Sequence, residues 1–307
     1  MKFTSTFALL ALPLGILARE QTQSGATWGL RAISHREPHA RPWQTSFRSF
    51  DYYYDEAAGE GTFAYVIDGG VRISHKEFEG RAEYLWTADR TPYPDDKPDY
   101  DDKTGHGTHV AGIIASKTYG VAKKARIVAV KVRNRHGMTT VSNLLSGLYR
   151  AVEDIKEKRR IGKAVINLSL GVTEDGCQDR AVQRVISTAV SNGITIVQAS
   201  GNEGKDAKDC CVAPKARAIT VGNMKPDWSV AEDSNFGSTV DLFGPGTDIL
   251  SLSGADDESV QLMSGSPKRS HEIRSLLDTT CTRDKIKGDL RGSPNKLVNN
   301  NNKKQGK

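Results

Sequence analysis

Short apolar runs alternate with amphipathic stretches along most of this sequence, and this alternation limits the possible folds more than any other feature. The runs are apolar on both sides, which is typical of strands buried in a parallel sheet. Residues 139–158 and 178–191 instead carry apolar side chains at helical spacing. We therefore predict a three-layer α/β fold, with a mostly parallel central sheet and helices on both faces. The predicted strands are residues 62–67, 127–132, 164–169, 194–199, 218–221 and 240–243.

The chain ends differ in composition from the rest of the 307 residues. In residues 1–18, Lys2 precedes an apolar run that ends on Ala18, a pattern typical of a secretory signal peptide, so we expect an extracellular protein. Residues 19–26 form a short polar segment that we expect to be mobile. Residues 299–307 are rich in Asn and Lys and predict a disordered tail. One domain, residues 27–298, lies between them.

Charge and hydropathy indicate which partners to expect. The net charge is +6, but apart from the tail the basic residues are scattered, so we do not expect nucleic-acid binding. Beyond the N-terminal run no segment is long enough to span a membrane, and we expect a monomer that does not bind membranes. Residues 95–102 are acidic, and we predict a solvated surface there, with a bound cation as the alternative.

A histidine lies between two glycines in the stretch Gly105–Gly112, which reads Gly-His-Gly-Thr-His-Val-Ala-Gly and leads into an apolar run. The glycines permit a tight turn and a close approach to a ligand. The apolar run predicts a helix, so His106 would lie at its start. A neutral imidazole there can take a proton from a nucleophile. The alternative is a glycine-rich loop whose histidines have no function.

Two more polar residues follow predicted strands. Asp68 ends the strand at residues 62–67, where it can orient an imidazole and stabilise its protonated form. Asn202 follows the strand at residues 194–199, and its amide can donate a hydrogen bond to a developing oxyanion. Taken singly, an Asp or Asn in such a place is usually a cap or turn residue, so the prediction rests on the set.

The set belongs to a wider pattern. The chain resembles the subtilisin-like serine endopeptidases (subtilases, peptidase family S8), and in particular their secreted fungal proteinase K branch. The resemblance is carried by Trp28–Leu30, Tyr52–Asp55, Ala64–Asp68, Gly105–His109, Tyr119–Lys124, Asn167–Gly171, Ser200–Asn202 and Leu242–Gly246.

The resemblance implies hydrolysis of peptide bonds in polypeptide substrates. It makes Asp68 and His106 members of an Asp-His-Ser triad and Asn202 the oxyanion donor. It also implies that a cleft-lining segment pairs with the peptide backbone. That segment is Ser169, Leu170 and Gly171.

The family requires no cofactor for its chemistry, but the resemblance implies a structural Ca²⁺ site. Its ligands would be the carboxylate of Asp241 and the carbonyl groups of Ala216 and Ala218, a set of oxygen ligands that suits Ca²⁺. The alternative is an ordinary Asp at a strand end.

Three features depart from the family pattern. Gly69 follows Asp68 where the family has Thr or Ser, which removes a hydroxyl group beside the carboxylate. The domain also follows the signal directly, without the family's pro-region. Four cysteines in a secreted chain predict disulfides, but they do not match the family's positions, and three pairings stay open. They are Cys177, Cys210, Cys211 and Cys281.

The fourth departure concerns the nucleophile. The family carries it in Ser-Gly-Thr-Ser-Met-Ala-x-Pro-His, which opens a buried helix, whereas this chain reads Ser-Gly-Ser-Pro from Ser264 and breaks the pattern near residues 265–271. We predict that the nucleophile helix is missing. Ser266 is the one serine that a gapped alignment offers, but Pro267 disfavours helical geometry there. The alternatives are an inactive relative that binds peptide or a partner protein, or a truncated or mis-spliced gene product.

Overall fold

The computed structural model describes residues 19–39, 48–89, 99–134, 138–170, 179–210, 217–265 and 281–306. Within these residues a nine-stranded sheet forms the centre, and its neighbouring strands run parallel except for the pair at one edge. The predicted mostly parallel sheet is confirmed. In spatial order the strands are β12 (Thr282–Arg283), β13 (Lys296–Leu297), β9 (Leu242–Pro245), β8 (Ile219–Met224), β7 (Thr195–Ala199), β6 (Ala164–Leu168), β3 (Phe63–Asp68), β5 (Arg126–Lys131) and β4 (Ala82–Thr87).

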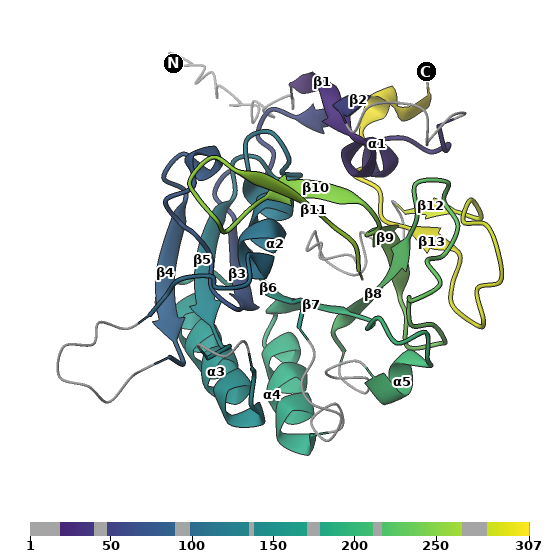
Figure 1. Ribbon diagram of the computed structural model, residues 1–307. Helices are drawn as coiled ribbons and strands as arrows, with labels where there is room; N and C mark the ends of the chain where they lie inside the picture. Colours follow the sequence, from purple (N-terminus) through teal and green to yellow (C-terminus); the bar gives the residue numbers. More distant parts are fainter. Residues whose placement is uncertain are drawn as a thin grey trace, which may run out of the picture.

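Helices cover both faces of this sheet (Figure 1). One face packs against α2 (His106–Ala115), and the other against α3 (Val141–Glu157) and α4 (Arg180–Ser191). The side chains of β3 alternate between two hydrophobic cores, one on each face of the sheet. Tyr65 and Ile67 belong to the core with α3 and α4, while Ala64 and Val66 belong to the core with α2. Because side chains alternate along a strand, a strand that is apolar on both sides builds three layers.

The helix boundaries follow from local capping. The Thr140 side chain accepts a hydrogen bond from the Asn143 N–H and starts α3, and the Asp179 side chain caps α4 in the same way. Side chains of these types satisfy backbone N–H groups that have no partner within the helix. Both helices therefore form within the stretches that helical spacing predicted.

The N-terminal polar segment is ordered, so the prediction of a mobile stretch at residues 19–26 was wrong. It forms β1 (Glu20–Thr27), which pairs antiparallel with β2 (Arg48–Asp55). The backbone hydrogen bonds of this pair do not depend on apolar side chains, which is why composition concealed the strand. The short helix α1 (Trp28–Ser34) follows, and all of its residues except Arg31 are buried.

The C-terminal residues are also ordered, and the prediction of a disordered tail was wrong for residues 299–306. The Asn300 backbone N–H donates to the Ile33 carbonyl at 2.7 Å, and its side-chain amide donates to the Tyr53 carbonyl at 2.7 Å. The Asn299 amide donates to the His35 carbonyl at 3.1 Å. Beyond them lies the 3-10 helix η3 (Lys303–Gly306), and Figure 1 shows this end of the chain beside α1 and β2.

A hairpin of β10 (Ile249–Leu252) and β11 (Val260–Met263) lies against α2 (Figure 1). The Ser251 hydroxyl donates to the His109 carbonyl at 2.9 Å, and the His109 ring nitrogen Nε2 lies 2.9 Å from the Ile249 carbonyl oxygen. The hairpin is thereby fixed to the first turns of α2.

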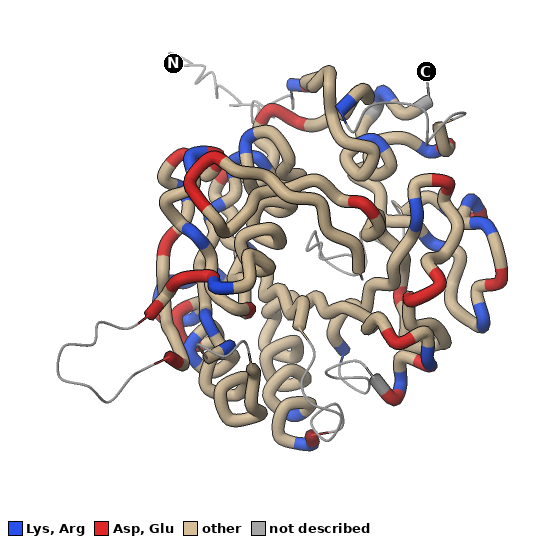
Figure 2. The backbone as a smooth tube through the Cα atoms, in the orientation of Figure 1, with Lys and Arg blue, Asp and Glu red and all other residues tan. Residues whose placement is uncertain are grey.

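Charged residues are interspersed along the outer loops and helices, and the central strands carry few of them (Figure 2). Two further short helices are η1 (Lys76–Phe78) and α5 (Ala207–Cys210). Among the described residues no helix is long and apolar enough to cross a bilayer. The predicted signal peptide lies outside the described residues, and so do residues 266–280, which include most of the stretch where the family pattern breaks.

Candidate active site

The structure brings Asp68 and His106 together at the carboxyl edge of the sheet. Asp68 ends β3, whose neighbours β5 and β6 lie on opposite sides of it, and its side chain is fully buried. His106 begins α2, directly after Gly105, which has a φ of 70°. The imidazole Nδ1 lies 2.7 Å from Asp68 Oδ1 and 2.9 Å from Oδ2. In open α/β sheets such an edge, where strands depart in both directions, is where ligands bind.

This contact fixes the tautomer of the neutral imidazole. A carboxylate only accepts hydrogen bonds, so in the neutral ring Nδ1 carries the proton and Nε2 keeps a lone pair that can take one. The Gly69 backbone N–H donates to Asp68 Oδ1 at 2.7 Å and holds the carboxylate in place. The His106 side chain is 22 % exposed, so a ligand can reach a ring that the buried carboxylate orients.

Gly107 permits the close approach of α2 to β3. A Cβ atom at this position would lie 2.0 Å from the Gly70 carbonyl oxygen and 3.1 Å from Asp68 Cβ. No side chain fits there, so only glycine lets the first turn of the helix reach the end of the strand. Gly107 thus allows Asp68 and His106 to come within hydrogen-bond distance.

Asn202 lies in the loop after β7, and the buried side chain of Asn235 organises this loop. Asn235 accepts hydrogen bonds from two backbone N–H groups of the loop and donates to the Ser200 carbonyl at 2.9 Å. Asn202 is exposed, and its Nδ2 would lie 3.2 Å from a Cβ atom built on Gly265. The amide therefore lies beside the residue that precedes Ser266, although Ser266 itself is outside the described residues.

The strand β11 spans the distance between these two parts of the site. At one end the Gln261 side-chain amide donates to the carbonyl of Gly105 at 3.1 Å, directly before His106. Beyond the other end the Gly265 N–H donates to the Gly246 carbonyl at 3.0 Å. Sequence reasoning missed Gln261 and Asn235, because nothing local marks a side chain whose partner is far away in the chain.

The predicted cleft-lining segment follows β6, next to β3. Ser169 and Leu170 are buried, and Gly171 is outside the described residues. The Ser169 hydroxyl is bound to the Asn167 side chain at 3.0–3.2 Å. Because that hydroxyl already has a partner, a peptide would pair with the main-chain N–H and C=O groups of this segment.

The acidic stretch is not wholly solvated, so that prediction was wrong for Asp102. This residue is 8 % exposed, and its carboxylate accepts hydrogen bonds from the backbone N–H and the hydroxyl of both Thr104 and Thr108, at 2.7–3.3 Å. Asp102 therefore ties the loop to the first turn of α2. Residues 95–98 are outside the described residues.

Around the predicted Ca²⁺ site the structure describes two of the three residues. Asp241 precedes β9, and its Oδ2 accepts a hydrogen bond from the Thr220 N–H at 2.9 Å. Ala218 is buried just before β8, and Ala216 is outside the described residues. A carboxylate with main-chain carbonyls fits a hard cation chemically. Among the described residues no group of three His, Cys, Asp or Glu side chains gathers as metal ligands.

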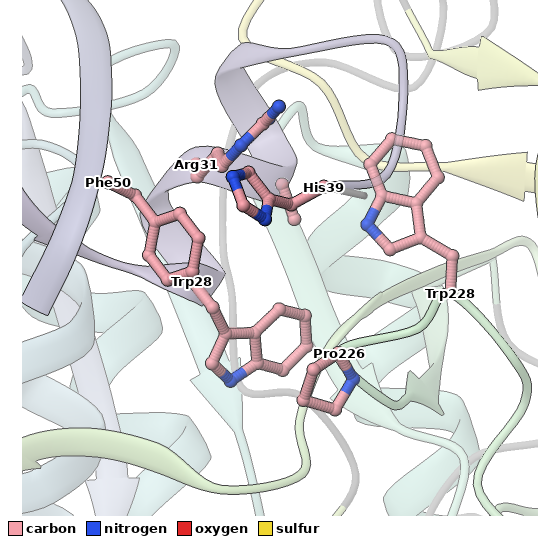
Figure 3. A pocket seen from close by; sticks show the side chains of 7 residues that line it. Trp28, Arg31, His39, Phe50, Pro226 and Trp228 are labelled. Carbon is pink, nitrogen blue, oxygen red and sulfur yellow. The ribbon is translucent and has the colours of Figure 1, made fainter. Parts of the chain in front are cut away.

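A pocket with other lining residues is shown in Figure 3. Its walls come from α1, the segment after α1, β2 and the segment after β8, and no predicted site residue takes part. The Trp28 indole N–H donates to the carbonyls of Thr247 and Asp248 at 3.0–3.1 Å, which fixes one wall. The lining residues are Trp28, Arg31, Ala32, His39, Phe50, Pro226 and Trp228.

Several known proteins are similar to this chain over most of its length. The chain is 39 % identical over 300 residues to "Alkaline protease 1" of Aspergillus flavus, covering 92 % of this chain and 69 % of that protein. It is 38 % identical over 305 residues to "Cuticle-degrading serine protease" of Arthrobotrys oligospora, with the same coverage. A solved structure of a cold adapted subtilisin-like serine proteinase matches with a TM-score of 0.73 and 30 % identity, over 90 % of this chain and 98 % of that one. The model of the subtilase family, Peptidase_S8, matches residues 59–279, and this chain belongs to that family.

Proposed function

We propose that this chain is a secreted subtilase that binds polypeptides and keeps the acid–base half of a serine endopeptidase site, but lacks the family's serine nucleophile. The observation that carries the proposal is the buried carboxylate of Asp68, both of whose oxygens lie within 2.9 Å of His106 Nδ1. A pair oriented in this way serves proton transfer to and from a reacting hydroxyl group. The membership in a family of proteases supports polypeptides as the ligand.

In a complete site of this kind each residue has one role. His106 Nε2 takes the proton of the serine hydroxyl as its oxygen attacks the peptide carbonyl, and then gives that proton to the leaving amine. Asp68 holds the ring and stabilises the imidazolium. Asn202 donates to the oxyanion of the tetrahedral intermediate. Ser169, Leu170 and Gly171 align the peptide backbone.

The absent nucleophile stops this sequence at its first step. Ser266 precedes Pro267, which disfavours the helical geometry that the family's serine adopts. In subtilisin, removal of the serine lowers kcat by about 10⁶-fold, equivalent to roughly 8 kcal/mol of barrier. We therefore expect peptide binding without appreciable turnover.

A second candidate is an active endopeptidase that uses Ser266. The position of Gly265 beside the Asn202 amide favours it, because the next residue then starts close to an oxyanion donor. A gene-model error is a third explanation of the gap. Sequencing the transcript across residues 255–285 tests it, and Thr-Ser-Met-Ala after Gly265 would be the result that supports it.

A serine-directed phosphonate distinguishes the first two candidates. We expect the full chain to remain unlabelled while a fluorescent peptide binds it, as measured by anisotropy. Labelling that disappears in Ser266→Ala would establish the active enzyme instead. Absence of binding for every peptide tested would contradict polypeptides as the ligand.

We also propose a structural Ca²⁺ ion held by Asp241 together with the carbonyls of Ala216 and Ala218. A cation that binds only the folded state raises its stability. Chelator should therefore lower the Tm of the full chain and leave the Tm of Asp241→Asn unchanged. An equal response of both proteins, or none in either, would contradict the site.

A further inference from the structure

We infer that Arg133 determines specificity by binding an acidic side chain of the polypeptide that occupies the cleft. The inference rests on the proposed function, because it assigns part of the same cleft. It adds a charge preference that neither the catalytic pair nor the cleft-lining segment provides.

Arg133 lies next to the catalytic pair. It follows β5, whose last residue, Lys131, pairs with Asp68, and the intervening Val132 N–H donates to the Asp68 carbonyl at 2.8 Å. A Cβ atom built on Gly69 would lie 3.3 Å from Arg133 Cδ. The aliphatic part of the arginine therefore packs on the residue directly after Asp68. Gly69, which departs from the family's Thr or Ser, leaves room for it.

The guanidinium group of Arg133 has one donor without an acceptor. Arg133 is half-buried, and its Nε is buried with no hydrogen-bond partner in the part of the chain that the structure describes. A buried donor without a partner destabilises the free protein. A guanidinium matches the planar fork of a carboxylate better than it matches any neutral side chain.

The neighbouring carboxylates already have partners. Asp102, whose Oδ1 lies 3.5 Å from the same Cβ position at Gly69, is saturated by two threonines. Asp99 lies 3.4 Å from Lys131, and Asp101 lies 3.1 Å from Lys103. Among the described residues no carboxylate lies within ion-pair distance of Arg133. The part of the chain that the structure describes thus supplies no carboxylate for Arg133, and we assign that carboxylate to the bound polypeptide.

The sheet places Arg133 where a bound peptide passes. β5 and β6 are the two neighbours of β3, so Arg133 and Ser169 lie on opposite sides of Asp68 at one sheet edge. Consider a peptide that pairs with the main chain after β6 and extends to His106. The peptide side chains that follow the paired segment then lie near the end of β5. One of those side chains can meet the guanidinium.

The test is equilibrium binding of the full chain to a matched peptide series. A neutral host peptide carries a single Gln, which is replaced by Glu at successive positions, and anisotropy gives each Kd. At one position we expect the Glu peptide to bind about tenfold more tightly than its Gln partner, as for a hydrogen bond to a charged group. Arg133→Gln should abolish this preference. Arg126→Gln, at the opposite end of β5, should retain it.

Two further variants keep the test decisive if Arg133→Gln folds poorly. Arg133→Lys should retain part of the preference, and Arg133→Glu should reverse it toward a Lys peptide, with melting curves confirming that each is folded. Equal binding of Glu and Gln peptides by the unaltered chain, or a preference that survives in Arg133→Gln, overturns the inference alone. Absence of binding for all peptides overturns the proposed function as well.

Discussion

Gly69 is the residue at which the acid–base pair and the proposed specificity residue meet. An added side chain would place Cβ 3.3 Å from both Arg133 Cδ and Thr104 Oγ1, which is a crowded contact. Gly69→Ser should therefore lower the free energy of unfolding more in the unaltered chain than in Arg133→Ala. We expect a coupling of about 0.5–1 kcal/mol, measured by urea denaturation of the four proteins.

The double-mutant comparison removes a complication of the single mutant. Replacing glycine also restricts the unfolded chain, and this effect is the same with and without Arg133. Identical changes in both backgrounds would show that Arg133 does not occupy the space at Gly69. The side chain of Arg133 would then not pack on Gly69.

Asp68 should determine which nitrogen of His106 carries the proton. With the carboxylate facing Nδ1 at 2.7 Å, the neutral ring should be protonated at Nδ1, and nitrogen chemical shifts measure this directly. Asp68→Asn removes the strict acceptor, and we expect a mixture of tautomers in its place. Asp99→Asn, which changes a carboxylate bound to Lys131, should leave the His106 shifts unchanged.

Only residues with a local signature could be predicted as site residues from the sequence. Asp68 and His106 lie at the ends of elements that their own neighbours predict, and Asn202 follows a recognisable strand. Gln261 and Arg133 carry no such signature. Their roles depend on contacts with Gly105 and Gly69, which are distant in the chain.

The same limit applies to whole elements. The helices α3 and α4 were predictable because their apolar spacing and their caps lie within one stretch of chain. The strand β1 and the ordered residues 299–306 were not predictable, because their polar groups become ordered only through hydrogen bonds to distant segments. The partner of β1 is β2. The partners of Asn299 and Asn300 are His35, directly after α1, and Tyr53 in β2.

The C-terminal contacts should therefore contribute measurably to stability. Removing residues 299–307 leaves the carbonyls of Ile33, His35 and Tyr53 without their donors. At about 0.5–1.5 kcal/mol for each hydrogen bond, the loss in free energy of unfolding is roughly 2–4 kcal/mol. Removing only residues 303–307 spares these contacts and should cost less than about 1 kcal/mol. Equal denaturation midpoints for the two truncations would contradict this account.

Lys123 should make stability depend on pH. Its ammonium group donates to the carbonyls of Lys117 and Thr118 and lies 5.4 Å from the ring centres of Tyr52 and Tyr54 in β2. Burial lowers the pKa of Lys123 to about 7. Between this pKa and the ordinary lysine value of 10.5, the unfolded chain binds more protons than the folded chain. The free energy of unfolding should therefore rise as pH increases from about 7 toward 10.5.

Lys123→Met tests the origin of that slope. The substitution should flatten the dependence of the free energy of unfolding over this pH range. Lys124→Met, which alters an exposed lysine 3.4 Å from Glu60, should keep it. A slope that persists in Lys123→Met would assign the effect to other groups.

For the whole molecule, one sheet edge gathers the residues that we propose for a hydrolytic site from distant segments. β3 supplies Asp68, α2 supplies His106, and the loop after β7 supplies Asn202 beside Gly265. The three-layer fold was predictable because central strands such as β3 and β5 are buried on both faces. The chain has no family motif for the nucleophile. Whether the protein hydrolyses peptides therefore depends on the chemistry of Ser266.

The rate of peptide hydrolysis tests that point most directly. The full chain, Ser266→Ala, His106→Ala and a chain with the family's nucleophile segment restored after Gly265 are compared on one fluorogenic peptide, with the pro-region of a relative supplied in trans. We predict that the first three hydrolyse it at the same background rate. The restored chain should be faster by orders of magnitude, and His106→Ala in that background should abolish the gain. Turnover by the unaltered chain that is lost in Ser266→Ala would contradict the account.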